Sequence, residues 1–179
     1  GLQNFRDLGG YPSYSTKKQM RWGMIYRSAE IDSLECSSRR ELKNLGIKTL
    51  IDLRASSEIG RQSPLQKGFN VVHIPLATGD MEGILKGIRE EKIKSDTVYR
   101  MVERMNRILI DQYTKEYRQI FDILLDKNSY PVVIHCSSGK GRTGIVSALV
   151  LAALGINEDI IMEDYRLSND YFTIPSASK

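Results

Sequence analysis

The chain has 179 residues, 41% of them hydrophobic and 27% charged, a composition typical of one globular domain. No run of 18 apolar residues occurs, so we expect no integral membrane segment. The net charge of +4 favours anionic ligands but is too small to indicate nucleic-acid binding. Two cysteines make neither a disulfide framework nor a metal site, and we expect no metal and no cofactor.

The chain begins at Gly1 rather than at a methionine, so loss of an upstream export signal is compatible with the sequence. Localisation is therefore open between the cytoplasm and export. The sequence does not indicate an oligomeric state.

Glycine-rich turns and apolar runs divide the chain into short elements. A hairpin or an irregular β segment is expected between Gly9-Gly10-Tyr11-Pro12 and Trp22-Gly23. The capping-box spacing of Ser38 and Glu41 predicts a short helix that ends at Gly46. Apolar runs at 47–53, 70–76 and 131–135 predict buried strands, and two apolar stripes predict helix from 95 to 126.

Strands separated by helical segments predict an α/β fold, with a central, largely parallel sheet flanked by helices on both sides. We expect residues 1–179 to form one domain, with a helical, lid-like elaboration at about 80–127. Gly155 should end the helix after residue 142, and the run 157–159 should cap the next helix.

The segment VVIHCSSGKGRTGIVSALVLAAL, residues 132–154, joins a strand to a helix through a cysteine-containing loop. In open α/β sheets, ligands bind beyond the carboxyl ends of strands, where Cys136 lies. The small residues after it allow backbone N–H groups to converge on an anion: Ser137, Ser138, Gly139 and Gly141. A helix N-terminus and the planar guanidinium of Arg142 favour the same anion and stabilise a thiolate. The loop therefore indicates a phosphate site with its own sulfur nucleophile.

Each feature alone has a simpler interpretation. A cysteine at a strand end is commonly a small buried side chain, and a glycine-rich turn is commonly a tight connection. Together they favour phosphate chemistry, because a cysteine at the end of a strand is followed by five residues and then by Arg142 at the start of a helix. The loop is not a nucleotide-binding P-loop, because the order Gly-x4-Gly-Lys-Ser/Thr is absent.

The loop HCSSGKGRTG resembles the active-site loop of the cysteine-based protein tyrosine phosphatase superfamily. Four further segments are similar to its atypical bacterial tyrosine/serine branch, some members of which also hydrolyse phosphoinositides: NFRDLGGY, RWGMIYRSA, LGIKTLIDLRASSE and EDYRLSN. The resemblance covers nearly the whole chain and is weakest between Gly79 and Ser129. It implies a tyrosine phosphatase-like fold and a cysteinyl-phosphate intermediate.

The resemblance also implies roles for individual residues. Cys136 would be the nucleophile, and Arg142 would bind the phosphate and its transition-state charge. Thr143 would donate to the thiolate or help to activate the hydrolytic water, and His135 would support the loop. Lys140 either recognises a highly anionic substrate or is simply solvated.

The general acid of the atypical branch is missing from its usual place. Several relatives carry an aspartate directly before the loop arginine, and here that position is Gly141. We expect the acid to be Asp80, which follows the predicted strand at 70–76, with Glu82 as the alternative. Asp80 could instead cap a helix.

Other charged and sulfur-containing residues are more ambiguous. Arg54 and Glu58 form either a supporting pair near the loop or a surface pair. Arg6 and Asp7 are expected to tie the N-terminal segment to the domain, and Cys36 is expected to be inert unless it forms a disulfide with Cys136.

The leading prediction is a metal-independent phosphatase of phosphotyrosine, phosphoserine or phosphoinositide substrates. A rhodanese-like sulfurtransferase and a non-catalytic phosphate-binding module are the alternatives. The expected partner is a phosphorylated protein or a phosphoinositide, and no nucleic acid.

Overall fold

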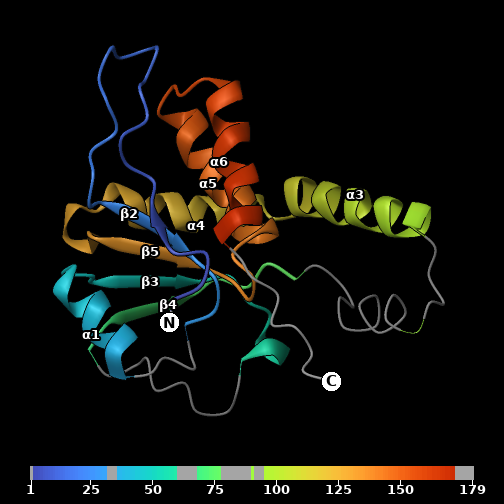
Figure 1. The fold of residues 1–179 in the computed structure, drawn as a ribbon, viewed down its shortest axis with the longest axis horizontal. Helices are drawn as coiled ribbons and strands as arrows, with labels where there is room; N and C mark the ends of the chain where they lie inside the picture. Colours follow the sequence, from blue (N-terminus) through green and yellow to red (C-terminus); the bar gives the residue numbers. More distant parts are fainter. Residues whose placement is uncertain (1, 32–35, 60–67, 78–89, 91–94, 172–179) are drawn as a thin grey trace.

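A five-stranded sheet forms the centre of the protein (Figure 1). The computed structural model describes residues 2–31, 36–59, 68–77, 90 and 95–171. The strands are β1 (Arg6–Asp7), β2 (Ile25–Ser28), β3 (Thr49–Asp52), β4 (Asn70–His73) and β5 (Val132–His135). Their order is β1-β2-β5-β3-β4, with β1 antiparallel to β2 and every other pair parallel. The expected α/β fold with a largely parallel sheet is confirmed.

The register brings the carboxyl ends of the central strands to one edge. His135 at the end of β5 pairs with Ser28 at the end of β2 and with Asp52 at the end of β3. All four residues of each of these three strands are buried. The loop that follows β5 is therefore flanked on its two sides by the residues that follow β2 and β3.

Helices cover both faces of the sheet, as expected (Figure 1). The helices are α1 (Cys36–Asn44), α3 (Ser95–Gln112), α4 (Thr114–Leu125), α5 (Gly141–Ala153) and α6 (Glu158–Tyr171), with 3₁₀ turns η1 (Ser56–Glu58) and η3 (Lys127–Ser129). Side chains alternate along β5: Val132 and Ile134 pack in the cluster that includes α3, α4 and α5, whereas Val133 packs in the cluster that includes Leu42 of α1. The sheet thus separates two apolar layers.

Two predicted helices differ from the observed ones. The capping box predicted at Ser38 is wrong, because α1 begins two residues earlier and Ser38 is buried inside it. The expected helix from 95 to 126 is divided at Tyr113, which separates α3 from α4. The hydroxyl of Tyr113 donates to Ala77 O (2.8 Å), and that of Tyr117 donates to Leu109 O (2.6 Å). The break therefore coincides with tertiary hydrogen bonds that helical periodicity does not reveal.

The smaller turn predictions are confirmed. Gly10 N–H donates to Met20 O and Met20 N–H donates to Tyr11 O (both 2.9 Å), which closes the N-terminal hairpin. Gly155 follows α5 with a φ of 72°. The side chain of Asn157 caps α6 by accepting from the N–H of Asp159 (3.1 Å).

The region expected to act as a lid is described only in part. Residues 78–89 and 91–94 lie outside the described residues. Within α3 and α4, Leu109, Ile120 and Leu124 belong to the apolar core, so α4 and the end of α3 help to cover the sheet. A lid role stays a prediction. In the described part of the chain, no helix combines the length and apolar character needed to cross a membrane.

Candidate active site

The cysteine loop, residues 136–142, leads directly from β5 into α5 at the carboxyl edge of the sheet. Gly139 has a φ of 68°, which glycine adopts without steric cost. A Cβ at this position would lie 2.5 Å from the carbonyl oxygen of Ser28, at the end of β2. The backbone therefore requires glycine here for both conformation and space.

Cys136 is buried beneath this turn, with 1% of its surface exposed. The N–H of Gly139 donates to Cys136 Sγ at 3.2 Å. A hydrogen bond from a backbone amide stabilises a thiolate, and α5 begins at Gly141, so the positive end of its dipole lies next to the loop. The predicted backbone hydrogen bond to the sulfur is present in the structure, and the nucleophilic role of Cys136 stays a prediction.

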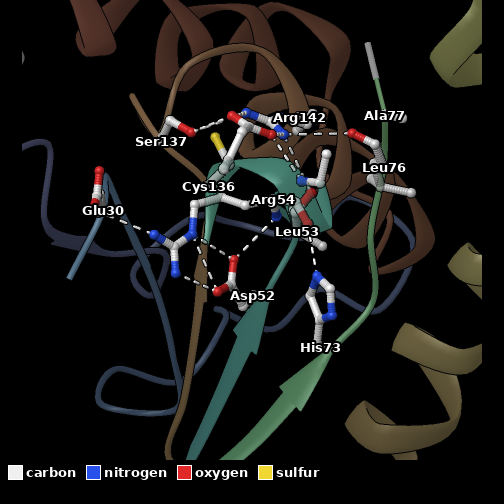
Figure 2. Close-up of polar contacts among 12 residues, drawn as sticks. Glu30, Asp52, Leu53, Arg54, His73, Leu76, Ala77, Cys136, Ser137 and Arg142 are labelled. Atoms are coloured by element: carbon white, nitrogen blue, oxygen red, sulfur yellow. Dashed lines mark hydrogen bonds and ion pairs between the residues drawn. The ribbon is translucent and has the colours of Figure 1, made fainter. Parts of the chain in front are cut away.

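The guanidinium of Arg142, which is shown near Ser137, Leu53 and Leu76 in Figure 2, is held in place by Glu58. Nη1 donates to Glu58 Oε2 at 2.5 Å and Nη2 donates to Oε1 at 2.8 Å, which is a two-pronged ion pair. Ser137 Oγ donates to Glu58 Oε1 (2.6 Å) and accepts from Arg142 Nη2 (3.2 Å). The carbonyls of Leu53 and Leu76 lie 3.5 Å from Nη1. The planar guanidinium is thus fixed by contacts with the protein itself.

The pKa values of the two partners follow from these contacts. Burial alone would raise the pKa of Glu58, but hydrogen bonds from Arg142, Ser137 and the amide of Ala55 lower it to about 2. Burial opposes the charge of Arg142, yet the hydrogen bonds and charge of Glu58, together with the charge of Cys136, raise its pKa. Both groups are therefore charged at neutral pH.

Arg54 and Glu58, which we expected to pair, bind different partners. Arg54 is buried and donates to Asp52 through Nε (2.9 Å to Oδ1) and Nη2 (2.6 Å to Oδ2). Its Nη1 also lies 3.3 Å from Glu30 Oε1 (Figure 2). Sequence spacing missed the pairing of Glu58 with Arg142 because these residues are 84 positions apart.

His135 and Thr143 are both fully buried beside the loop. His135 O accepts from Leu53 N–H (2.9 Å), and its Nε2 lies 3.9 Å from Asp52 Oδ2, so the residue joins β5 to the end of β3. Thr143 Oγ1 has no hydrogen-bond partner among the described residues, so the expected donation to the thiolate is not formed. The role of Thr143 stays a prediction.

The residues at the rim of the loop are placed as follows. Lys140 is half-buried, with Nζ 3.5 Å from Asn169 Oδ1. Gly141 starts α5, and a Cβ there would meet nothing within 4 Å. Asp80 and Glu82, the two candidates for the general acid, lie outside the described residues.

Two of the residues expected to secure the N-terminal segment have well-defined partners. Arg6 Nε donates to Asp164 Oδ1 of α6 (3.1 Å), so it ties β1 to the helical layer. Asp7 instead accepts from the N–H groups of Gly9 (2.7 Å) and Gly23 (2.6 Å), within the N-terminal segment itself. Arg27 and Asp164 were not singled out from the sequence, although both lie in segments that carry the family resemblance.

Comparisons with known proteins identify the family of this chain. Residues 1–178 match the model of a family described as the tyrosine phosphatase family. The triple specificity protein phosphatase PtpB of Mycobacterium tuberculosis is 32% identical over an alignment of 192 residues, gaps included. The alignment covers 95% of this chain and 68% of that protein. A candidate tyrosine-protein phosphatase of Cupriavidus necator is 28% identical. The match covers 94% of this chain and 61% of that protein.

The solved structure of the Siw14 catalytic core shares the fold. It superposes with a TM-score of 0.55 at 18% identity, covering 86% of this chain and 73% of that one. The family match over residues 1–178 and the relative at 32% identity confirm the family resemblance inferred from HCSSGKGRTG and the accompanying segments. The chain belongs to the tyrosine phosphatase family of cysteine-dependent phosphatases.

Proposed function

We propose that this protein hydrolyses phosphate monoesters through a cysteinyl-phosphate on Cys136. The observation that carries the proposal is the hydrogen bond from Gly139 N–H to Cys136 Sγ, formed within a loop whose arginine is already fixed by Glu58. A nucleophile and a preorganised anion-binding group then lie in one loop.

In the first step, the Cys136 thiolate attacks phosphorus, forming an S–P bond while the P–O bond to the leaving group breaks. Arg142 and the loop amides bind the charge that develops on the equatorial oxygens. The leaving oxygen takes a proton from an acid, for which we propose Asp80, with Glu82 as the alternative. In the second step, water attacks phosphorus and gives a proton to the carboxylate left by the acid, while the S–P bond breaks, the Cys136 thiolate is restored and inorganic phosphate leaves.

The other loop residues support these steps. We assign phosphate binding to the amides of residues 137–141, and loop support to His135, which connects β5 to Leu53. Thr143 lies directly after Arg142 and would assist the thiolate or the attacking water. Residues 1–179 would act as one catalytic domain, with the region at about 80–127 including a lid over the site.

The substrate would be a phosphorylated protein or a phosphoinositide. Two observations support testing this broad range: Lys140 adds a positive charge at the rim of the loop, and a relative that is 32% identical is named a triple specificity phosphatase. Extra negative charge on a substrate would be attracted by a lysine that is not fully buried.

Turnover of phosphotyrosine and phosphoserine peptides and of phosphoinositides by the purified protein tests the proposal. Cys136→Ser should abolish turnover but retain binding of phosphate esters, whereas Arg142→Ala should weaken both. Vanadate should inhibit the wild type, because it resembles the transition state of phosphoryl transfer. Substantial turnover by Cys136→Ser would exclude the covalent intermediate, and transfer of sulfur from thiosulfate without phosphatase activity would favour the rhodanese-like alternative.

A further inference from the structure

The outer side of the cysteine loop is held by hydrogen bonds to its carbonyl oxygens. Three consecutive carbonyls accept from donors on two segments, the N-terminal segment and β2 with the residues that follow it: Ser137 O from Glu30 N–H (3.0 Å), Ser138 O from Asn4 Nδ2 (3.1 Å) and Gly139 O from Arg27 Nη2 (2.8 Å). Two of the donors are side chains, and both are buried, Asn4 at 1% and Arg27 at 0% exposure.

Holding a carbonyl on one side of a peptide directs the next N–H to the other side. In a trans peptide the C=O and the following N–H point in opposite directions. The peptide between Ser138 and Gly139 shows the effect, because its oxygen accepts from Asn4 while its N–H donates to Cys136 Sγ at 3.2 Å. Arg27 holds the next peptide through Gly139 O, and the N–H of that peptide, which belongs to Lys140, donates to Ser138 Oγ at 3.4 Å. The donor from Asn4 thus favours the orientation in which Gly139 N–H faces the sulfur, and the donor from Arg27 holds the peptide that follows.

Asn4 and Arg27 share one support, the carboxylate of Asp164 on α6. Arg27 Nη1 donates to Asp164 Oδ2 at 2.5 Å. Arg6 Nε donates to Asp164 Oδ1 at 3.1 Å, and Arg6 Nη1 donates to Asn4 Oδ1 at 2.5 Å. The second bond leaves the amide nitrogen of Asn4 directed at Ser138 O. A buried carboxylate between two arginines therefore sets the orientation of both donors.

The backbone at Asn4 agrees with this specialised placement. Its φ is 50°, in the left-handed region that asparagine and aspartate tolerate better than most residues. Its N–H donates to Tyr171 O (2.9 Å) at the end of α6, so the N-terminal segment is attached to the same helix that provides Asp164.

We propose that Asn4 and Arg27 are positioning residues of the phosphatase reaction, which hold the carbonyls of Ser138 and Gly139 on the outer side of the loop so that Gly139 N–H faces Cys136, and that Asp164 is their common support. This proposal rests on the proposed function of the cysteine loop. It assigns a role in catalysis to the NFRD segment, which otherwise only fastens the chain terminus to the domain.

Asn4→Asp is the sharpest test, because the two side chains have the same shape and both tolerate a positive φ. Aspartate still accepts from Arg6, but it presents a carboxylate oxygen instead of an N–H to Ser138 O. We expect kcat/KM to fall about 10–100-fold, less than the ~10²–10³-fold lost when an oxyanion-binding donor is itself removed. Alkylation of Cys136 by iodoacetamide at fixed pH should also slow, because Gly139 N–H no longer faces the sulfur.

Tyr11→Phe is the matched control. It removes the hydroxyl that donates to Asp164 Oδ1 (3.2 Å) but leaves both bonds to the loop carbonyls. Kinetics should therefore stay within about twofold of the wild type. All variants are compared well below their melting temperatures, so that a lower Tm alone does not change the readout.

Arg27→Lys provides an independent test if Asn4→Asp does not fold. A single ammonium lacks the planar fork that binds Asp164 and Gly139 O together, so a similar loss of kcat/KM and of alkylation rate is expected. Wild-type kinetics and alkylation in a folded Asn4→Asp or Arg27→Lys variant would overturn the proposal. Absence of phosphatase activity in the wild type would instead refute the proposed function, so the two failures are distinguishable.

Discussion

Replacing Glu58 with glutamine should weaken both the fold and the site. Glutamine keeps one acceptor oxygen but directs an NH₂ group at a guanidinium that it cannot bind. The pKa of Glu58 is lowered from 4.5 to about 2, and without solvent screening this shift would correspond to a contribution of about 3 kcal/mol to the free energy of unfolding. Because 34% of this side chain is exposed, solvent screens the pair, and we expect a loss of about 1–2 kcal/mol at pH 7.

The sign of the pH dependence follows from the direction of this pKa. A carboxylate whose pKa is lower in the folded state stabilises the fold above its unfolded pKa, 4.5, and loses that contribution as the pH falls through about 2. Urea unfolding at pH 7, 4.5 and 2.5 should therefore show the wild type and Glu58→Gln converging in stability toward low pH. In parallel, kcat/KM should fall at least tenfold, because Arg142 is no longer fixed.

Glu103→Gln is the control for loss of a carboxylate. Glu103 pairs with Arg107 at 2.8 Å on α3, but both side chains are mostly exposed, at 63% and 74%. Its removal should change stability by no more than about 0.5 kcal/mol and leave kinetics unaffected. If Glu58→Gln behaves like Glu103→Gln at every pH, the inference that Glu58 fixes the loop arginine is refuted.

The remaining predictions concern the proton donor and the substrate. Asp80→Asn should slow hydrolysis of alkyl phosphates by ~10²–10⁴-fold and of nitrophenyl phosphate much less, and Glu82→Gln should show this pattern instead if Glu82 is the acid. Adding Gly141→Asp to whichever of these two variants is impaired should restore part of the alkyl phosphatase rate. A side chain at position 141 has open space, and a carboxylate there lies at a helix N-terminus. No recovery would indicate that this position cannot deliver the proton. Lys140→Ala should reduce phosphoinositide turnover several-fold more than nitrophenyl phosphate turnover, and equal losses would mean that it binds every substrate alike.

The central part of the fold could be predicted because its information is local. Apolar runs locate β3, β4 and β5, although the observed strands are shorter, as at β3, where the run 47–53 contains Thr49–Asp52. The strand–loop–helix around Cys136 is contiguous in the chain, so its residue types alone indicate an anion site with a nucleophile. Gly139 and Gly155 both have positive φ values, consistent with their predicted places in turns.

Pairings between distant segments could not be predicted in this way. Arg27 and Asp164 are 137 positions apart, and their ion pair depends on how α6 packs against the sheet. The i,i+4 spacing of Arg54 and Glu58 suggests a partnership, but η1 turns Glu58 toward the loop while Asp52 binds Arg54. The i,i+4 spacing brings two side chains together only within an α-helix. Here the two residues lie in a segment that leaves a strand and enters a 3₁₀ turn, so the rule does not apply.

The position of β5 explains why the cysteine loop has two carboxylate–arginine pairs of different character. β2, on one side of β5, provides Arg27, whose pair with Asp164 has side chains only 0% and 2% exposed. β3, on the other side, leads into η1 and Glu58, which holds Arg142 while 34% exposed. Under the proposed function, only the second pair borders the phosphate site, so we expect it to stay partly open to water and to a phosphate ester. Salt screens exposed pairs more than buried ones. High ionic strength should accordingly weaken the hold on Arg142 before it disturbs the orientation of the loop peptides, so that phosphate binding declines while the loop keeps its shape.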